Sequence, residues 1–143
     1  MEAEKLMKLA RYLVKVPPAR FDFTVIVRGV TIPTQEDNCG TMACALGNLP
    51  FVFPERFEYR SNEIGRVNVH DKEENSPLEY LTYVEPICSF FDLSAIEVLG
   101  LFSAYEQHEI GQAELGSSAS PLEVAQNIAS YVSRHSSVDT SLA

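Results

Sequence analysis

The stretch from Asn38 to Gly47 constrains the fold of this chain more than any other segment. Its ten positions hold two of the three cysteines, two glycines and several other small residues. Gly47 is a typical helix stop and Pro50 bars a longer helix, so the pattern predicts a short buried helix over residues 39–47 that other helices approach closely. A second interpretation makes Cys39 a nucleophile at the start of that helix, where the helix dipole favours the thiolate.

Length and composition predict a single globular domain that needs neither a disulfide nor a metal ion to fold. The chain has 143 residues, of which 45% are hydrophobic and 22% are charged, as is typical of globular proteins. Basic residues interrupt the apolar positions at the amino terminus, and no run reaches the roughly 20 apolar residues that a bilayer requires. Three cysteines without an export signal favour reduced thiols. We therefore expect a cytoplasmic protein that does not contact membranes, with one domain over residues 1–135 and a disordered end over 136–143.

Apolar periodicity and helix-start signals predict a mainly helical α+β fold with about five helices. Three Ser-x-x-Glu capping boxes begin at Ser76, Ser94 and Ser120 and predict three helix starts. Pro86 should kink or divide the first of these helices. An apolar stripe that ends at two prolines predicts a further helix near the amino terminus. Besides the short central helix over 39–47, the expected helices are 2–16, 77–91, 95–105 and 121–134.

Runs rich in β-branched residues predict a small antiparallel sheet. Residues 21–32 form one expected strand, broken at Gly29. Residues 57–60 and 66–70 alternate with period two, and the five residues between them end in Gly65, which is typical of a β-hairpin. We expect the sheet to combine the single strand with this hairpin.

Charge is distributed unevenly along the chain, whose formal net charge is −9. The interval between Lys72 and Arg134 holds ten acids and no Lys or Arg. An acidic surface repels nucleic-acid phosphates and attracts basic proteins, so direct nucleic-acid binding is not expected. The first functional interpretation is an interaction protein whose acidic carboxyl-terminal half docks on a basic protein partner, and the alternative is that the acids only solubilise outer helix faces. The predicted docking residues are Glu106, Glu109 and Glu114.

Cysteine chemistry gives a second functional interpretation, a small thiol hydrolase or transferase. A nucleophilic Cys39 needs a base within reach, and His70 with Asp71 as its orienting acid is the best pair that the chain offers. The segment resembles the nucleophile helix of papain-type cysteine proteases, but Met42 stands where those enzymes have the catalytic cysteine. Because free cysteines are most often buried, we expect packing rather than catalysis at Cys39.

Metal ions and cofactors are not expected. Cys39 and Cys44 would point about 140° apart on a regular helix, so they cannot share an ion there. The chain has three histidines and shows no Cys-x-x-Cys or His-x-x-x-His spacing. It also lacks a glycine-rich phosphate loop. We therefore predict neither a metal site nor a bound cofactor.

Four short motifs occur in a fixed order along the chain, at residues 21–23, 39–47, 90–102 and 120–125. This order resembles a group of small uncharacterised bacterial and phage proteins that share Phe-Asp-Met, Cys-Gly-Thr-x-x-Cys-x-x-Gly, Phe-Phe-Gly-Leu followed by Leu-Phe, and Thr-Pro-x-x-Val-Ala. Phe23 stands here in place of the Met and Asp92 in place of a Gly. The resemblance implies a mostly helical fold and a phage or mobile-element origin. It also implies packing roles for Cys39 and Cys44.

Overall fold

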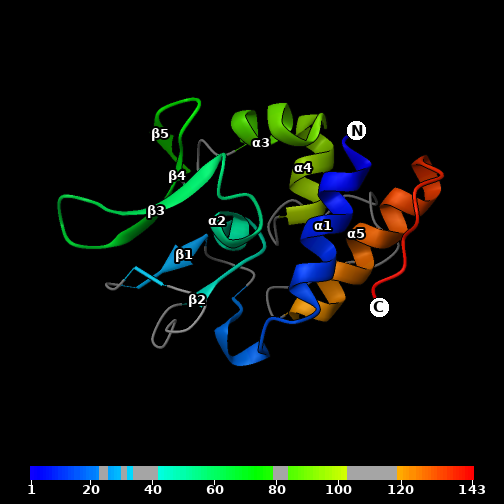
Figure 1. Ribbon diagram of the computed structural model, residues 1–143, viewed down its shortest axis with the longest axis horizontal. Coiled ribbons are helices and arrows are strands. Elements are labelled where there is room, and N and C mark those ends of the chain that lie inside the picture. The colour runs from blue at the N-terminus through cyan, green and yellow to red at the C-terminus, as the bar shows by residue number, and fades with distance from the viewer. Residues whose placement is uncertain (23–25, 30–31, 34–41, 79–83, 103–118) are drawn as a thin grey trace.

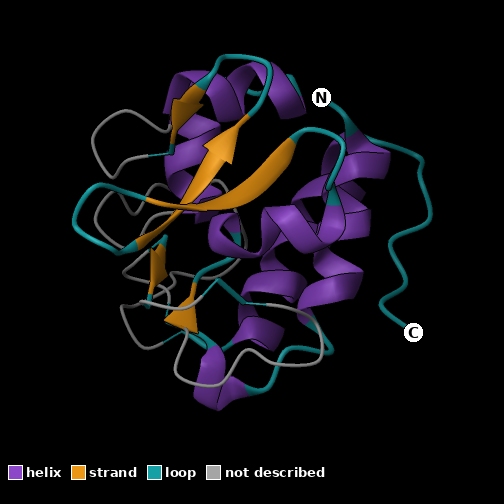
Figure 2. Ribbon diagram, turned by 60° about the vertical axis from the view of Figure 1, so that its left-hand side comes forward, coloured by secondary structure: helices purple, strands orange, loops and turns teal. Residues whose placement is uncertain are grey.

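The computed structural model describes residues 1–22, 26–29, 32–33, 42–78, 84–102 and 119–143. Within these ranges it contains five α-helices, two short 3₁₀ helices and five strands, which confirms the expected mainly helical α+β fold. The strands form one two-stranded and one three-stranded sheet, both antiparallel. Figure 1 shows the longer helices gathered on one side of the molecule and the strands on the other, and Figure 2 shows the molecule turned so that the strands come forward.

Two amphipathic helices form the centre of the helical side. α1 (Ala3–Leu13) confirms the predicted amino-terminal helix, and α5 (Pro121–His135) runs beside it in the opposite direction (Figure 1). The core between them contains the fully buried residues Leu6, Leu9, Leu13, Ile128 and Val132. Each fully buried Leu or Ile contributes about 1.5–3 kcal/mol to stability.

No helix within the described ranges combines the length and the apolar character needed to cross a bilayer.

Capping boxes fix the starts of two helices, as predicted. The Ser120 amide donates to Glu123 Oε1 at 3.0 Å, and the Glu123 amide donates to Ser120 Oγ at 3.1 Å. The same reciprocal pair joins Ser94 and Glu97 at 2.9 and 3.3 Å, at the start of α4 (Ala95–Phe102). Both boxes satisfy amides that the first helical turn leaves unpaired. The predicted end of the second helix, near residue 105, lies outside the described residues.

The predicted helix start at residue 77 is wrong, because Ser76–Pro77 form the strand β5. The following residue, Leu78, is buried, and its amide donates to the Val69 carbonyl oxygen at 2.8 Å. Pairing with a neighbouring strand therefore prevails over the local capping signal. The helix α3 is described as Val84–Phe91, with Pro86 as the third residue of this range. The predicted kink or division at Pro86 stays a prediction, because residues 79–83 lie outside the described residues.

The predicted hairpin is confirmed. β3 (Phe57–Ser61) pairs antiparallel with β4 (Val67–Asp71), and Gly65 turns the chain between them with a φ of 79°. β5 adds a third strand on the other side of β4. The single strand predicted over 21–32 is described only as β1 (Val27–Arg28), which pairs with a separate two-residue strand rather than joining the hairpin sheet. A backbone bond from the Val67 amide to the carbonyl oxygen of Gly29, the residue after β1, at 3.0 Å connects this segment to the hairpin sheet.

The short central helix predicted over 39–47 is wrong in the part that the structure describes. Met42–Ala43 form the strand β2, which pairs antiparallel with β1, and the Cys44 amide continues the pairing to the Ile26 carbonyl oxygen at 3.3 Å. A 3₁₀ helix, η2 (Leu46–Asn48), follows, and the α-helix α2 (Leu49–Val52) begins only after it. Pro50, expected to bar a helix, instead lies in the first turn of α2, where its missing amide is not needed.

Gly47 allows η2 to approach β1 closely. A Cβ atom at this position would lie 1.6 Å from the Ile26 carbonyl oxygen and 2.6 Å from Ala43 Cβ. The glycine that the sequence suggested as a helix stop therefore serves close packing of two backbone segments. The Gly47 carbonyl oxygen also accepts a hydrogen bond from the Tyr59 hydroxyl at 2.6 Å.

Residues 136–143, predicted to be a disordered end, form no helix or strand, and Arg11 of α1 binds them. The Arg11 guanidinium donates to the carbonyl oxygens of Ser141 at 2.9 Å and Asp139 at 2.8 Å. The side chains of Val138 and Leu142 pack on the core. A few contacts thus hold this segment beside the helix.

Candidate functional site

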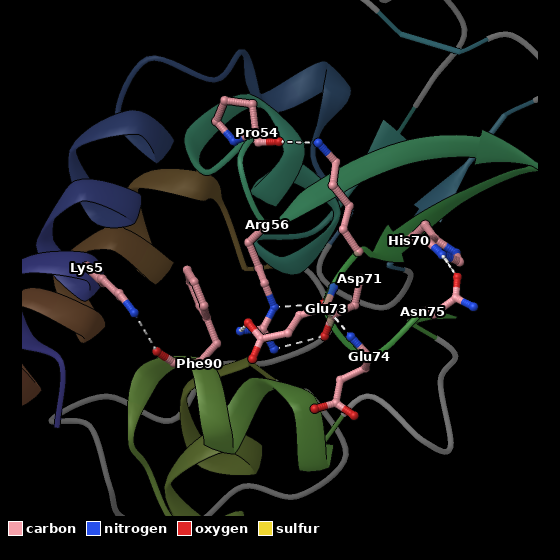
Figure 3. Close-up of polar contacts among 10 residues, drawn as sticks. Lys5, Pro54, Arg56, His70, Asp71, Glu73, Glu74, Asn75 and Phe90 are labelled. Atoms are coloured by element: carbon pink, nitrogen blue, oxygen red, sulfur yellow. Dashed lines mark hydrogen bonds and ion pairs between the residues drawn. The ribbon is translucent and has the colours of Figure 1, made fainter.

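The structure places His70 and Asp71 next to each other on β4, and Cys39 lies outside the described residues. The side chains of His70 and Asp71 are both buried. His70 Nε2 lies 3.3 Å from Asn75 Oδ1. Figure 3 shows these two side chains facing each other. Successive side chains on a strand point to opposite faces of a sheet. Accordingly, no hydrogen bond between the His70 and Asp71 side chains occurs in the described part of the chain.

The Asp71 carboxylate is bound by Arg56 (Figure 3). Arg56 Nε and Nη2 donate to its two oxygens at 2.7 and 3.1 Å, and the amides of Glu73 and Glu74 donate to Oδ1 at 3.0 and 3.4 Å. Burial alone would raise the pKa of Asp71, but the bonds from Arg56, Glu74 and Glu73 outweigh it and hold the pKa below its ordinary value. Asp71 therefore anchors Arg56 and the following turn, and the Cys39–His70 pair stays a prediction.

Most of the described carboxyl-terminal acids have local partners. Glu73 accepts from Arg56 at 2.9 Å, Glu97 and Glu123 complete capping boxes, and Asp92 lies 2.8 Å from the Met1 amino group. These bonds explain several acids without a docking partner. The docking prediction stays a prediction, because its three residues lie outside the described ranges: Glu106, Glu109 and Glu114.

The two described cysteines are poor nucleophiles. Cys44 is 3% exposed, and burial raises the pKa of its thiol from 9.0 to about 11. Cys88 is half-buried, and burial raises its pKa as well. Across the part of the chain that the structure describes, no three His, Cys, Asp or Glu side chains gather in an arrangement that could hold a metal ion.

We expect Cys44 to react with iodoacetamide only after unfolding. A pKa raised from 9.0 to about 11 leaves about a hundredfold less thiolate at neutral pH, and burial also blocks access. Mass spectrometry of the native protein after labelling measures the rate at each cysteine, with Cys88 as the more exposed reference. Labelling of native Cys44 at the rate of a free peptide thiol would contradict the buried placement. In the same experiment, a labelling rate at Cys39 no higher than that of a free thiol would rule out the catalytic hypothesis.

A cleft of about 520 Å³ opens where the end of α1 meets the 3₁₀ helix η1 (Pro18–Arg20), β2, η2, α2 and β3. Figure 1 shows α2 and β2 at the boundary between the helices and the strands. The volume of the cleft lies within the range of small-molecule sites. We call it the aromatic cleft and define it by Tyr12, Lys15, Arg20, Asn48, Phe51 and Tyr59.

Three aromatic rings form the wall of the aromatic cleft. Phe51 stacks on Tyr12 with ring centroids 6.2 Å apart and meets Tyr59 edge-on at 5.3 Å. Burial raises the pKa of both tyrosines, so their hydroxyls stay protonated and the wall stays neutral at physiological pH. The bond from the Tyr59 hydroxyl to the Gly47 carbonyl oxygen fixes the Tyr59 ring. The wall therefore offers a rigid apolar surface.

The charged part of the aromatic cleft is positive. Lys15 follows the last turn of α1, and Arg20 ends η1; both are exposed. The described lining contains no Asp or Glu, and neither cation forms an ion pair with an acid in the described ranges. The adjoining prolines, Pro17 and Pro18, restrict the backbone between the two cations. This arrangement can hold an anion beside a planar group.

Sequence reasoning missed the aromatic cleft because its residues come from six separate elements and form no motif. The only sequence signal was the excess of five basic over two acidic side chains in residues 1–20. Most such charges lie on the solvent face of a helix, so the excess by itself does not indicate a site. The two cations enter a common cleft only when η1 packs against β2.

The fold and the aromatic cleft together define a small, mainly helical α+β protein with one side of its helix–strand boundary open to a ligand. Comparison of the chain with protein-family models, with curated proteins and with solved structures found no match.

Proposed function

We propose that this protein binds a small anionic ligand with a planar apolar body in the aromatic cleft. The observation that carries the proposal is a contrast of charge. The chain has a formal net charge of −9, yet the described lining of the cleft has two cations and no acid. A positive pocket in an acidic protein concentrates the field on a small anion, while the surrounding surface repels large polyanions.

The aromatic wall supplies the second part of the recognition. A ring laid on Phe51 would bury apolar surface on both partners and gain stacking energy of about 0.5–1.5 kcal/mol. Because Tyr12 and Tyr59 are held by their contacts with Phe51, little side-chain freedom would be lost on binding. The anion would then pair with Lys15 or Arg20 at the cleft, where salt can screen the attraction.

Isothermal titration with anilinonaphthalene sulfonate, an aromatic anion, tests the proposal. We expect one bound probe per chain, with affinity that falls as salt is raised. The Lys15→Gln, Arg20→Gln double variant should bind about tenfold more weakly or worse, since charged hydrogen bonds contribute about 1.5–3 kcal/mol. The chain has no Trp and six Tyr, so tyrosine emission, to which Tyr12 and Tyr59 both contribute, gives a second readout.

Arg66→Gln is the matched control, because Arg66 is an exposed cation on the hairpin, away from the cleft. It should leave binding unchanged, and the thermal unfolding curves of all variants should match that of the parent protein. Equal binding by the double variant and the parent protein would overturn the proposed site. An affinity that does not change with salt concentration would also overturn the proposed site.

A further inference from the structure

We infer that the ligand of the aromatic cleft is a mononucleotide, an aromatic heterocycle that carries a phosphomonoester. This inference rests on the proposed function and names the class of ligand. Three features of the cleft carry it: its paired cations, its buried carboxamide and its size.

The paired cations favour a dianion over a monoanion. Lys15 and Arg20 lie on either side of the Pro17–Pro18 turn and both line the cleft. A phosphomonoester carries about −1.5 to −2 charges at neutral pH and three acceptor oxygens, which suit two donors that approach from different elements. The planar fork of Arg binds phosphate with two parallel bonds, and Lys adds a point charge. A carboxylate or sulfonate would use only part of this capacity.

A buried amide favours a heterocycle over a hydrocarbon ring. Asn48 lines the cleft and is 7% exposed. Its Nδ2 atom donates to the Cys44 carbonyl oxygen at 2.8 Å, which uses one of its two N–H donors and fixes the plane of the amide. A hydrocarbon ring would cover the amide without pairing it, at a cost in desolvation. Nucleobases instead present in-plane donors and acceptors, with which Asn amides pair well.

The size and charge of the site favour one nucleotide over a strand. The cleft of about 520 Å³ is of the size that holds a single small molecule. The three-ring wall provides the stacking surface on which a base is typically held. A polynucleotide would bring further phosphates against a chain of net charge −9. In the proposed complex, the base therefore stacks on Phe51 and the edge of the base faces Asn48. The phosphate of the nucleotide pairs with Lys15 and Arg20.

Titration with separated parts of a nucleotide tests the inference. The probes are the four common nucleoside monophosphates, their nucleosides, ribose phosphate and inorganic phosphate. We expect at least one monophosphate to bind about tenfold more tightly than its nucleoside and than ribose phosphate, because base and phosphate contacts add. A short single-stranded oligonucleotide should bind no more tightly than the best monophosphate.

Two variants separate the contacts, with Arg66→Gln as the control that should change nothing. Arg20→Gln should weaken the monophosphate about tenfold and leave the nucleoside within twofold. Phe51→Leu should weaken both about tenfold, because it removes the stacking ring. Monophosphates that bind no better than inorganic phosphate, or an oligonucleotide that binds more tightly, would overturn the inference. If anilinonaphthalene sulfonate still binds through Lys15 and Arg20, the proposed function survives that result; if it does not bind, both fail.

Discussion

Replacing Gly47 by alanine is expected to destabilise the native state by about 4 kcal/mol or more, the range of the most severe single substitutions. The new Cβ would lie 1.6 Å from the Ile26 carbonyl oxygen and 2.8 Å from the Ile26 carbonyl carbon. These are backbone atoms, so no side chain can rotate away to make room. Relief of the clash requires β1 and η2 to separate, which breaks the Cys44–Ile26 backbone bond.

Urea denaturation followed by circular dichroism measures the effect, and Gly65→Ala is the matched control. Gly65 has a φ of 79° but no atom within 4 Å of an added Cβ, so its replacement costs only backbone strain of about 1 kcal/mol. If Gly47→Ala does not fold, its dichroism will show no cooperative transition while Gly65→Ala keeps one. Equal stability of the two variants would contradict the close approach. Because the Gly47 carbonyl binds Tyr59, a folded Gly47→Ala should also lose ligand affinity at the cleft.

Replacing Asp71 by asparagine is expected to lower the free energy of unfolding by about 3–5 kcal/mol at neutral pH. The Asp71 side chain is fully buried and that of Arg56 is 12% exposed, so loss of the carboxylate leaves a largely buried guanidinium without its bidentate partner. Arg56 is also packed over the rings of Phe57 and Phe90, which limits its escape to solvent. Chemical denaturation measures the change.

Glu73→Gln is the control for this pair, because Glu73 bonds to the same guanidinium at 2.9 Å with a side chain that is 70% exposed. Exposed ion pairs contribute about 0–1 kcal/mol, so this variant should stay within that range. An Asp71→Asn protein as stable as Glu73→Gln would show that the buried pair is dispensable. A loss of several kcal/mol in Glu73→Gln would contradict the assigned difference in burial.

The stability contributed by Asp71 should depend on pH in a defined direction. Its pKa is held below the ordinary value of 3.8 in the folded protein, so the folded state favours the ionised form. The contribution is therefore fully present above pH 3.8 and is lost as the pH falls through the folded pKa. The difference between the unfolding curves of the parent protein and Asp71→Asn should begin to shrink below about pH 4 and should vanish once the pH is below the folded pKa of Asp71. A gap that stays constant down to acid pH would contradict the pairing with Arg56.

The elements that could be predicted from sequence are those whose signals lie within a few residues. The apolar stripe of α1, the boxes at Ser94 and Ser120 and the Gly65 hairpin each depend on neighbours three to six positions away. The same boxes assign two of the many acids, Glu97 and Glu123, to helix starts, and the structure confirms both.

One tetrapeptide shows why local signals fail elsewhere. Ser-Pro-Leu-Glu occurs at residues 76–79 and at 120–123; the second copy begins α5, whereas Ser76–Pro77 of the first copy form β5. Leu122 is 47% exposed, so the helix can face it to solvent, whereas Leu78 is 3% exposed and bonded to Val69 of β4. Burial against a strand outweighs a cap that contributes about 1 kcal/mol.

The sequence by itself determined the amphipathic helices, two of their caps and the hairpin, because these rest on interactions between residues close in the chain. Only the tertiary structure determines the conformation of residues 42–47. Their sequence favours a helix, but the folded chain brings β1 and the Ile26 carbonyl oxygen, 18 residues from Cys44, alongside them as a strand partner. It also decided the aromatic cleft, which assembles Arg20, Asn48 and Tyr59 from separate elements. Strand pairing and cleft formation require partners that only the folded chain brings together.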